Sequence, residues 1–332
     1  VTNYNHNMLS QSFLIALAVI PVTLASPYYN PYFGKYFHGQ RTSGDSSSSG
    51  NFYPVKDCST FIDQNPETSW SCHNKSPVSA ANSCCFEENG IILLTQFWDY
   101  NTTLLEIAVN GSTSDIVEAE LKSKLDTVYN DLSRTFTIHG TWDDFCNGSY
   151  PQYCNKSLEV SDEKDNLTHI LVDQFKEVEL YNIMSKYWID TIASNVDSSA
   201  STALWEHEYN KHGTCMTTLS PSCFTSQNYT RFENVVNFYK KTVEIWSQLD
   251  TFEFLAAAGI YPTVSRKYKL SQVQEALQKA HGAEVYVGCL NNSISEIWYF
   301  YNLQGSILTG TYKPIDTTTN TKCKDEVWYI PK

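Results

Sequence analysis

Residues 205–215 read WEHEYNKHGTC, and they concentrate chemically active side chains within a few positions. Two of the 8 histidines of the chain fall here, with a glutamate and a lysine between them. If the segment is a helix closed by Gly213, a rotation of about 100° per residue places four of these groups on one arc of about 140°. The four are His207, Glu208, Lys211 and His212, whereas Glu206 falls on the opposite side. We expect this arc to form one wall of a site.

Three kinds of chemistry compete for this arc. Two imidazoles, an ammonium and a carboxylate can grip a phosphate and move protons, because the usual histidine pKa of about 6.5 leaves one ring neutral and another charged in mild acid. An exposed charged helix face is the simpler alternative. Zinc is the third, but His207 and His212 are five positions apart, and the H-E-x-x-H pattern needs four. The sequence therefore predicts no metal and no other cofactor.

A second segment, residues 134–150, reads RTFTIHGTWDDFCNGSY. His139 follows a strand-like run and precedes a glycine, so we expect its ring at a strand end facing a cleft. Trp142, Asp144 and Tyr150 follow closely. A flat aromatic surface and a carboxylate suit stacking and hydrogen bonding of a nucleobase. The alternative is a core tryptophan beside a turn aspartate.

The charge of the chain is acidic, with 36 Asp and Glu against 23 Lys and Arg and a net charge of -13. At neutral pH such a surface repels polyanions, which argues against a stoichiometric nucleic-acid binder. Near the sequence pI of about 5.0 this repulsion largely disappears. The charge balance therefore excludes RNA as a partner only at neutral pH.

The amino-terminal region predicts export. An uncharged apolar run follows Met8 and ends at small residues near Ala25, which is the layout of a secretory signal peptide over residues 1–25 with its start at Met8. A buried core helix is the weaker alternative. Residues 26–50 are rich in Tyr, Gly and Ser and indicate a flexible spacer, so we expect one folded domain over residues 51–332. No later apolar run has the length of a membrane span.

Cysteines and glycosylation sequons agree with export. The 10 cysteines include no C-x-x-C pair, and five disulfides in an oxidising compartment explain them best, with the pairing left open. Asn-x-Ser/Thr sequons begin at Asn74, Asn101, Asn110, Asn147, Asn155, Asn166, Asn228 and Asn291. We therefore expect an N-glycosylated protein of the extracellular space or of a vacuolar, lysosome-like lumen. A monomer is expected.

Apolar periodicity predicts an α+β fold. Strand-like runs cover residues 90–98, 134–142, 283–290 and 295–308, and helical periodicity covers residues 113–132, 170–188, 234–249 and 271–282. The two kinds of segment do not alternate regularly. An antiparallel sheet flanked by several helices follows better than a doubly wound fold.

TIHGTW and WEHEYNKHGTC closely resemble the two active-site motifs of the ribonuclease T2 family. The resemblance runs from about Cys58 to Cys323 and includes SCCF at residues 83–86 and TQFWDY at residues 95–100. Similarity to fungal members implies disulfides that join Cys58 to Cys85, Cys72 to Cys146, Cys84 to Cys223, Cys154 to Cys215, and Cys289 to Cys323.

The family cleaves single-stranded RNA without a metal, with low base specificity and an acidic optimum, through a 2′,3′-cyclic phosphate to 3′-phosphate ends. The resemblance implies that DNA, which lacks the 2′-hydroxyl, is not cut. It makes His212 the general base and His139 the general acid, while Lys211 and Glu208 stabilise the phosphorane. His207 holds the phosphate. The resemblance also implies that Trp142, Asp144 and Tyr150 form one base pocket. Gln96 is implied to belong to a second base pocket.

The chain departs from the family pattern in three places. Thr141 and Asp143 replace the usual Leu and Pro around the tryptophan of the first motif, Ile189 replaces a Pro, and residues 115–132 form an extra charged segment that predicts a surface helix. A secreted protein that keeps the fold but acts only by binding is the main rival function, and a zinc hydrolase is a distant one. Both His139 and His212 are present, which favours the enzyme.

Overall fold

The computed structural model of the chain describes residues 53, 55–73, 78–111, 132–190, 198–224 and 229–332. The predicted signal peptide, the spacer and residues 115–131 of the predicted surface helix lie outside these residues. Within the described part, no helix combines the length and the apolar character needed to cross a membrane.

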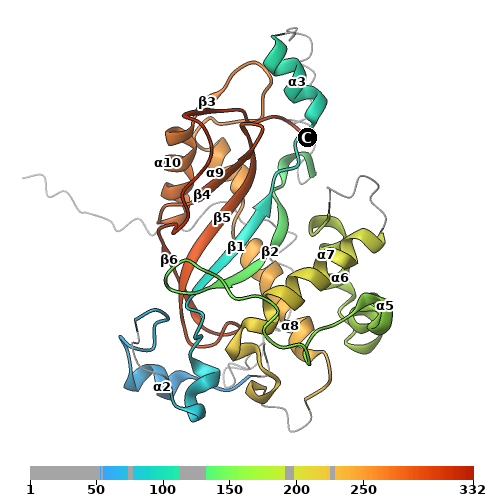
Figure 1. Cartoon of the computed structure of the whole chain (residues 1–332), viewed down its shortest axis with the longest axis vertical. Coiled ribbons are helices and arrows are strands. Elements are labelled where there is room, and N and C mark those ends of the chain that lie inside the picture. The colour runs from blue at the N-terminus through green and yellow to red at the C-terminus, as the bar shows by residue number, and fades with distance from the viewer. Residues whose placement is uncertain (1–52, 54, 74–77, 112–131, 191–197, 225–228) are drawn as a thin grey trace, which may run out of the picture.

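A five-stranded antiparallel sheet forms the centre of the fold (Figure 1). Its strands run in the order β2 (Thr137–Asp144), β1 (Ile91–Phe97), β5 (Ser293–Gln304) and β4 (Tyr286–Leu290), and β6 (Thr311–Ile315) pairs with the second half of β5. A separate ribbon joins β3 (Tyr268–Lys269) to β7 (Glu326–Val327). Strand β2 is an edge strand, and the histidine motif of residues 137–142 lies on it.

Helices flank the sheet. The α-helices are α2 (Ser59–Gln64), α3 (Thr102–Asn110), α5 (Asp162–Asp165), α6 (Val178–Tyr187), α7 (Ser198–Lys211), α8 (Glu233–Trp246), α9 (Thr251–Ala256) and α10 (Leu270–His281). Short 3-10 turns span Ala80–Cys85, Leu132–Arg134, Gly213–Cys215, Thr217–Leu219 and Pro221–Cys223, and a π-helical turn spans His169–Gln174. The α+β architecture predicted from the sequence is confirmed.

The sheet separates two unequal apolar layers. Ile92 and Leu94 of β1 point into the main core, which also contains residues of helices α6 to α10. Ile91 and Leu93 point to the other side, where they meet Phe300 and the half-buried Trp142. In Figure 1 helices α8 and α9 lie behind the sheet, and β2, β1 and β5 face the viewer. Within the described residues, the apolar cluster on the second face consists of strand side chains and Cys72.

All four predicted strands are present, but one predicted helix is wrong in its extent. Residues 170–188 form a π-helical turn and helix α6 as separate pieces, because Lys176 between them adopts a left-handed backbone with φ 60°. A helix of L-residues cannot continue through that conformation. The break puts Trp188, at the end of α6, beneath strand β2.

Five disulfides connect the loops to this frame, and their pairing is the one that the family resemblance implies. Two of them hold the chain after β2: Cys146 is joined to Cys72, and Cys154 to Cys215 just beyond α7. The amide of Tyr153 also donates to the carbonyl of Lys211 at 3.0 Å. The segment after β2 is therefore fixed against the end of the histidine-bearing helix.

Replacing both Cys154 and Cys215 by alanine is expected to lower the free energy of unfolding by roughly 4 kcal/mol, because the bridge restricts a loop of 61 residues in the unfolded chain. Urea unfolding of the oxidised double variant and of the parent protein measures this difference. A loss below about 1 kcal/mol would mean that hydrogen bonds such as the Tyr153 amide contact hold the segment without the bridge.

Candidate active site

A β-bulge positions His139. Thr95 of β1 pairs with Gly140 and Gln96 pairs with Ile138, so His139 has no partner residue across the strands. The extra residue turns the His139 ring to the same face as Trp142, three positions later. There the ring stacks on Phe97, with centroids 3.9 Å apart and planes at 19°.

Tryptophans of the core support the bulge from below. Trp188 donates its indole N–H to the carbonyl of His139 at 2.8 Å, and Trp205 of α7 donates to the carbonyl of Trp188 at 2.7 Å. Both indoles are buried. This chain of hydrogen bonds joins β2, the end of α6 and α7, so the position of His139 relative to α7 is fixed by packed, hydrogen-bonded groups.

Glu208 brings a buried carboxyl group from α7 to strand β2. Its Oε2 accepts a hydrogen bond from Trp142 Nε1 at 2.8 Å, and its Oε1 lies 3.5 Å from His139 Nε2. Gly140 makes this approach possible, because a Cβ there would lie 1.9 Å from Glu208 Oε2. Strand β2 can therefore contact Glu208 of the second motif only because Gly140 of the first motif has no side chain.

His212 follows the last residue of α7. Its ring stacks on Trp142, with centroids 5.1 Å apart and planes at 18°. His212 is 3% exposed, and neither ring nitrogen has a hydrogen-bond partner among the described residues. The Nδ1 atom of His139 is also buried without such a partner. These three nitrogens therefore keep their hydrogen-bonding capacity for a group bound at the site.

Gly213 has a different role from the one predicted. We expected it to close the helix, but the chain continues into the 3-10 turn Gly213–Cys215, and Gly213 is not among the glycines with positive φ. A Cβ at this position would lie 2.7 Å from the Tyr209 ring. The glycine is required because the backbone packs directly on Tyr209, and this packing fixes His212 beside it.

Burial and positive charge keep both histidines neutral. Burial first, and then the charges of Lys211 and His207, lower the pKa of His139 to about 3. The same causes, with His139 added, lower the pKa of His212 to about 2. Lys211 therefore acts on both rings. An anion placed beside either ring would raise its pKa again.

Burial also keeps Glu208 protonated. It raises the pKa of Glu208 to about 8, although the Trp142 hydrogen bond and the charge of Lys211 oppose this change. The 3.5 Å approach to His139 has the geometry of an ion pair. Because the pKa values favour the neutral form of both groups between about pH 3 and 8, we treat it as a contact between a neutral ring and a carboxylic acid.

His207 lies at the outer edge of this cluster. It is exposed, and its Nδ1 is 3.3 Å from the hydroxyl of Tyr153. The sequence analysis missed Tyr153, as it missed Phe97 and Trp188. Tyr153 could have been found from the sequence, because it lies next to Cys154, which is bridged to Cys215 of the second motif.

The residues predicted to bind bases differ in their environment. Trp142 is half-buried, and its N–H is already used by Glu208. Asp144 shares the face of Trp142, and burial raises the pKa of its carboxyl to about 7. Tyr150 is 59% exposed.

Gln96 does not reach this surface, and here the structure contradicts the sequence-based expectation. Its side chain is completely buried, its amide donates to the carbonyl of Leu249 at 3.0 Å, and its oxygen accepts from the Thr251 hydroxyl. The residue after it, Phe97, occupies the site face instead.

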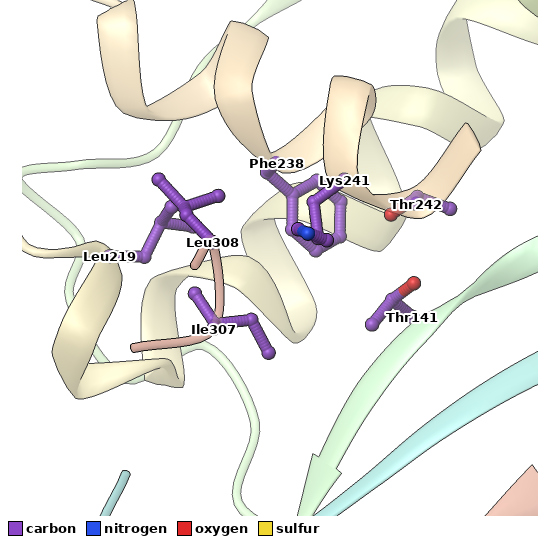
Figure 2. Close-up of a pocket in the computed structure, with 7 residues that line it drawn as sticks. All are labelled: Thr141, Leu219, Phe238, Lys241, Thr242, Ile307 and Leu308. Atoms are coloured by element: carbon purple, nitrogen blue, oxygen red, sulfur yellow. The ribbon is translucent and has the colours of Figure 1, made fainter. Parts of the chain in front are cut away.

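The two departures in the first motif also point away from the site. Thr141 and Asp143 alternate with Trp142, and both are buried on the core side of β2. Figure 2 shows Thr141 facing a small pocket beside Lys241 of α8. Asp143 accepts a hydrogen bond from Asn89 at 2.7 Å. These substitutions therefore change the interior beneath the strand.

The arrangement of these groups can be compared with known proteins. Residues 89–323 match the model of the Ribonuclease T2 family, and this range includes both histidine segments. The chain belongs to the ribonuclease T2 family. Among the residues that the structure describes, no group of three or more His, Cys, Asp or Glu side chains is placed to hold a metal ion.

Fungal proteins of the T2 family are similar over most of this chain. Ribonuclease T2-like 1-A of Candida albicans is 42% identical over 78% of this chain and 59% of its own length. Ribonuclease T2 of Aspergillus oryzae is 39% identical over 79% of this chain and 82% of its own length. A T2-like ribonuclease of Debaryomyces hansenii is matched over 56% of its length, so the chain spans little more than half of some T2 relatives.

The crystal structure of Actibind, a T2 ribonuclease, is similar in fold. It superposes with a TM-score of 0.64 at 35% identity and covers 79% of this chain and 95% of its own. The T2 fold of the present chain is therefore shown by sequence and by structure.

The Glu208→Gln variant is expected to gain stability over the parent protein as pH rises. Below about pH 4.5 the carboxyl is protonated in both the folded and the unfolded chain, so it contributes no difference. Between about pH 4.5 and 8 only the unfolded chain releases the proton, which lowers the free energy of unfolding of the parent by up to about 1.4 kcal/mol per pH unit.

Chemical unfolding of both proteins at pH 4, 6 and 8 measures this dependence, with Glu275→Gln on the exposed side of α10 as the matched control. A constant difference between Glu208→Gln and the parent across this range would contradict the raised pKa.

Proposed function

We propose that this chain is an endoribonuclease that cleaves single-stranded RNA by metal-independent transphosphorylation. The observation that carries the proposal is the placement of two neutral imidazoles around one indole. The rings of His139 and His212 lie 4.9 and 5.1 Å from the ring of Trp142, and both carry buried nitrogens without partners among the described residues. Such a pair supplies a proton acceptor and a proton donor to one bound phosphodiester.

In the proposed reaction the ribose 2′-oxygen forms a bond to phosphorus while the bond from phosphorus to the 5′-oxygen breaks. His212 accepts the proton of the 2′-hydroxyl, and His139 donates a proton to the departing 5′-oxygen. A 2′,3′-cyclic phosphate remains, and water then hydrolyses it slowly to a 3′-phosphate. DNA lacks the nucleophilic hydroxyl, so it binds without being cut.

The remaining groups of the cluster stabilise the charge that grows on the phosphorane. Lys211 supplies positive charge, and its electrostatic effect on Glu208 and both histidines supports this role. Glu208, protonated in the free site, donates a hydrogen bond to a phosphoryl oxygen. His207 holds the phosphate from the outer edge, together with Tyr153.

The acidic optimum follows from the same electrostatics. A bound phosphodiester brings negative charge next to His139 and His212 and raises their pKa values, so binding takes up a proton. Proton uptake makes RNA bind more tightly as the pH falls. The decrease of the net negative charge near pH 5.0 acts in the same direction.

Base recognition is proposed for Trp142, Asp144 and Tyr150, without Gln96. The half-buried indole offers a stacking surface. Because burial raises the pKa of Asp144 to about 7, its protonated carboxyl can both donate and accept a hydrogen bond in mild acid. A group with both capacities accepts more than one base, which supports low specificity.

We also propose that the protein is a secreted or vacuolar glycoprotein and acts as a monomer. All ten cysteines are paired, which suits an oxidising compartment. The sequon asparagines within the described residues, Asn101, Asn110, Asn147, Asn155, Asn166 and Asn291, are all exposed. Glycan occupancy is measured by mass before and after enzymatic deglycosylation.

The function is tested by cleavage of a defined single-stranded RNA from pH 4 to 8 in excess chelator, with product ends identified by mass. His139→Ala and His212→Ala are each expected to lose about 10²- to 10⁴-fold in rate, because each removes one proton transfer. His169→Ala is the matched control, since His169 is 60% exposed and pairs with Asp173 on the π-helical turn.

Cyclic-phosphate ends, an acidic optimum and an active His169→Ala variant are the expected results. Intact RNA at every pH, from folded and oxidised protein, would contradict the proposal and favour a protein that acts by binding. Full activity of either His139→Ala or His212→Ala would remove the assigned acid-base pair, and inhibition by chelator would favour a metal-dependent hydrolase.

A further inference from the structure

Aromatic side chains continue across the sheet from the catalytic cluster. Trp298 of β5 lies next to Trp142, with ring centroids 5.0 Å apart and planes at 70°. Tyr286 of β4 lies beyond it, 4.2 Å from Trp298 with planes at 31°. Tyr286 is the direct register partner of Trp298, whereas Trp142 lies diagonally across β1, where it pairs with Leu93 and Trp298 pairs with Thr95. This is the face that points toward the viewer in Figure 1.

Gly288 of β4 leaves room for the ring of Tyr286. A Cβ at Gly288 would be 3.0 Å from Tyr286 Cε1 and 3.0 Å from Glu296 Cβ, so a side chain there would lift the phenol ring from the strand. Tyr286 and Trp298 are both half-buried, which leaves part of each ring open to solvent. With centroids 4.2 Å apart, the two rings stack on one another, and Trp298 meets Trp142 in an edge contact.

A carboxylate lies at the side of this surface. Glu296 is half-buried, and one of its oxygens accepts a hydrogen bond from Trp298 Nε1 at 2.9 Å. No hydrogen bond to the other oxygen is formed within the described part of the chain. An oriented carboxylate oxygen beside two rings matches the amino and imino N–H groups at the edge of a nucleobase.

We propose that Tyr286, Trp298 and Glu296 form an additional nucleotide subsite for the RNA chain beyond the two nucleotides that flank the cleaved bond. One base stacks on the outer face of the Tyr286 ring, which is itself stacked on Trp298, and the free oxygen of Glu296 accepts a hydrogen bond from the edge of that base. The inference rests on the proposed function. Its occupant is the substrate itself, because the surface is continuous with the cluster through the contact between Trp298 and Trp142.

This subsite is separate from the pocket proposed for Trp142, Asp144 and Tyr150. Those residues belong to β2 and the loop after it, whereas the new surface lies on β4 and β5. Tyr286 is the residue to change first, because its ring contact is with Trp298 and not with Trp142. Its loss can therefore be separated from damage to the catalytic cluster.

The test compares Tyr286→Leu with the parent protein on a dinucleoside monophosphate and on a six-nucleotide RNA. The loss of kcat/KM on the longer substrate is expected to exceed the loss on the shorter one by about tenfold, the scale of one base stacked on one aromatic ring. We expect the additional loss of kcat/KM on the longer substrate to result from a higher KM. Tyr286→Phe keeps the ring and is expected to keep the preference, and Tyr261→Leu, 46% exposed in the loop after α9, is the matched control.

Equal losses on the two substrates, or none, would overturn the subsite and leave Tyr286 as a cover for the apolar residues beneath it. Binding of a six-nucleotide DNA, measured by fluorescence, tests the surface without cleavage, and Tyr286→Leu is expected to weaken it about tenfold relative to Tyr261→Leu. If the parent protein cleaves neither RNA, the proposed function is contradicted. The DNA-binding measurement still tests the subsite in that case, because it does not depend on cleavage. Unchanged DNA binding by Tyr286→Leu would contradict it.

Discussion

The contact between helix α7 and strand β2 at Glu208 is the constraint on which the site depends. A buried carboxyl with one hydrogen bond to Trp142 is costly to ionise, and burial accordingly raises its pKa. The contact exists only because Gly140 has no side chain, and the hydrogen bonds through Trp188 and Trp205 hold the two elements together. The main core thus fixes groups whose own burial is unfavourable.

This cost has a consequence for function. The cluster contains two neutral imidazoles, a carboxylic acid and the ammonium of Lys211, so the charge of these four groups is positive. In the proposed reaction a phosphodiester supplies negative charge beside the histidines, and its binding converts them to forms that can transfer protons. The bridge between Cys154 and Cys215 keeps the segment with Tyr153 next to His207 at the rim of the cluster.

Features that depend on short-range patterns could be predicted from the sequence. The polar arc of residues 207–212, the four strands and, through the family resemblance, the five disulfides were all visible in it. It did not predict the bulge at His139, because a regular strand would place His139 and Trp142, three residues apart, on opposite faces. Gln96 was misplaced for a related reason: alternation along β1 sends it into the core and brings Phe97 to the site. The positions of His139 and Gln96 both depend on how strands that are distant in the sequence pair with one another.

The central claim is that His139 and His212 remain neutral until an anion enters. Its most direct test is an NMR titration of the two imidazoles in the free protein and with a DNA dinucleotide, which offers the phosphodiester but cannot be cleaved. The account predicts pKa values well below the ordinary 6.5 in the free protein, near 3 for His139 and near 2 for His212, and a rise of both on binding. Two histidines that titrate near 6.5 in the free protein and do not respond to the dinucleotide would contradict it.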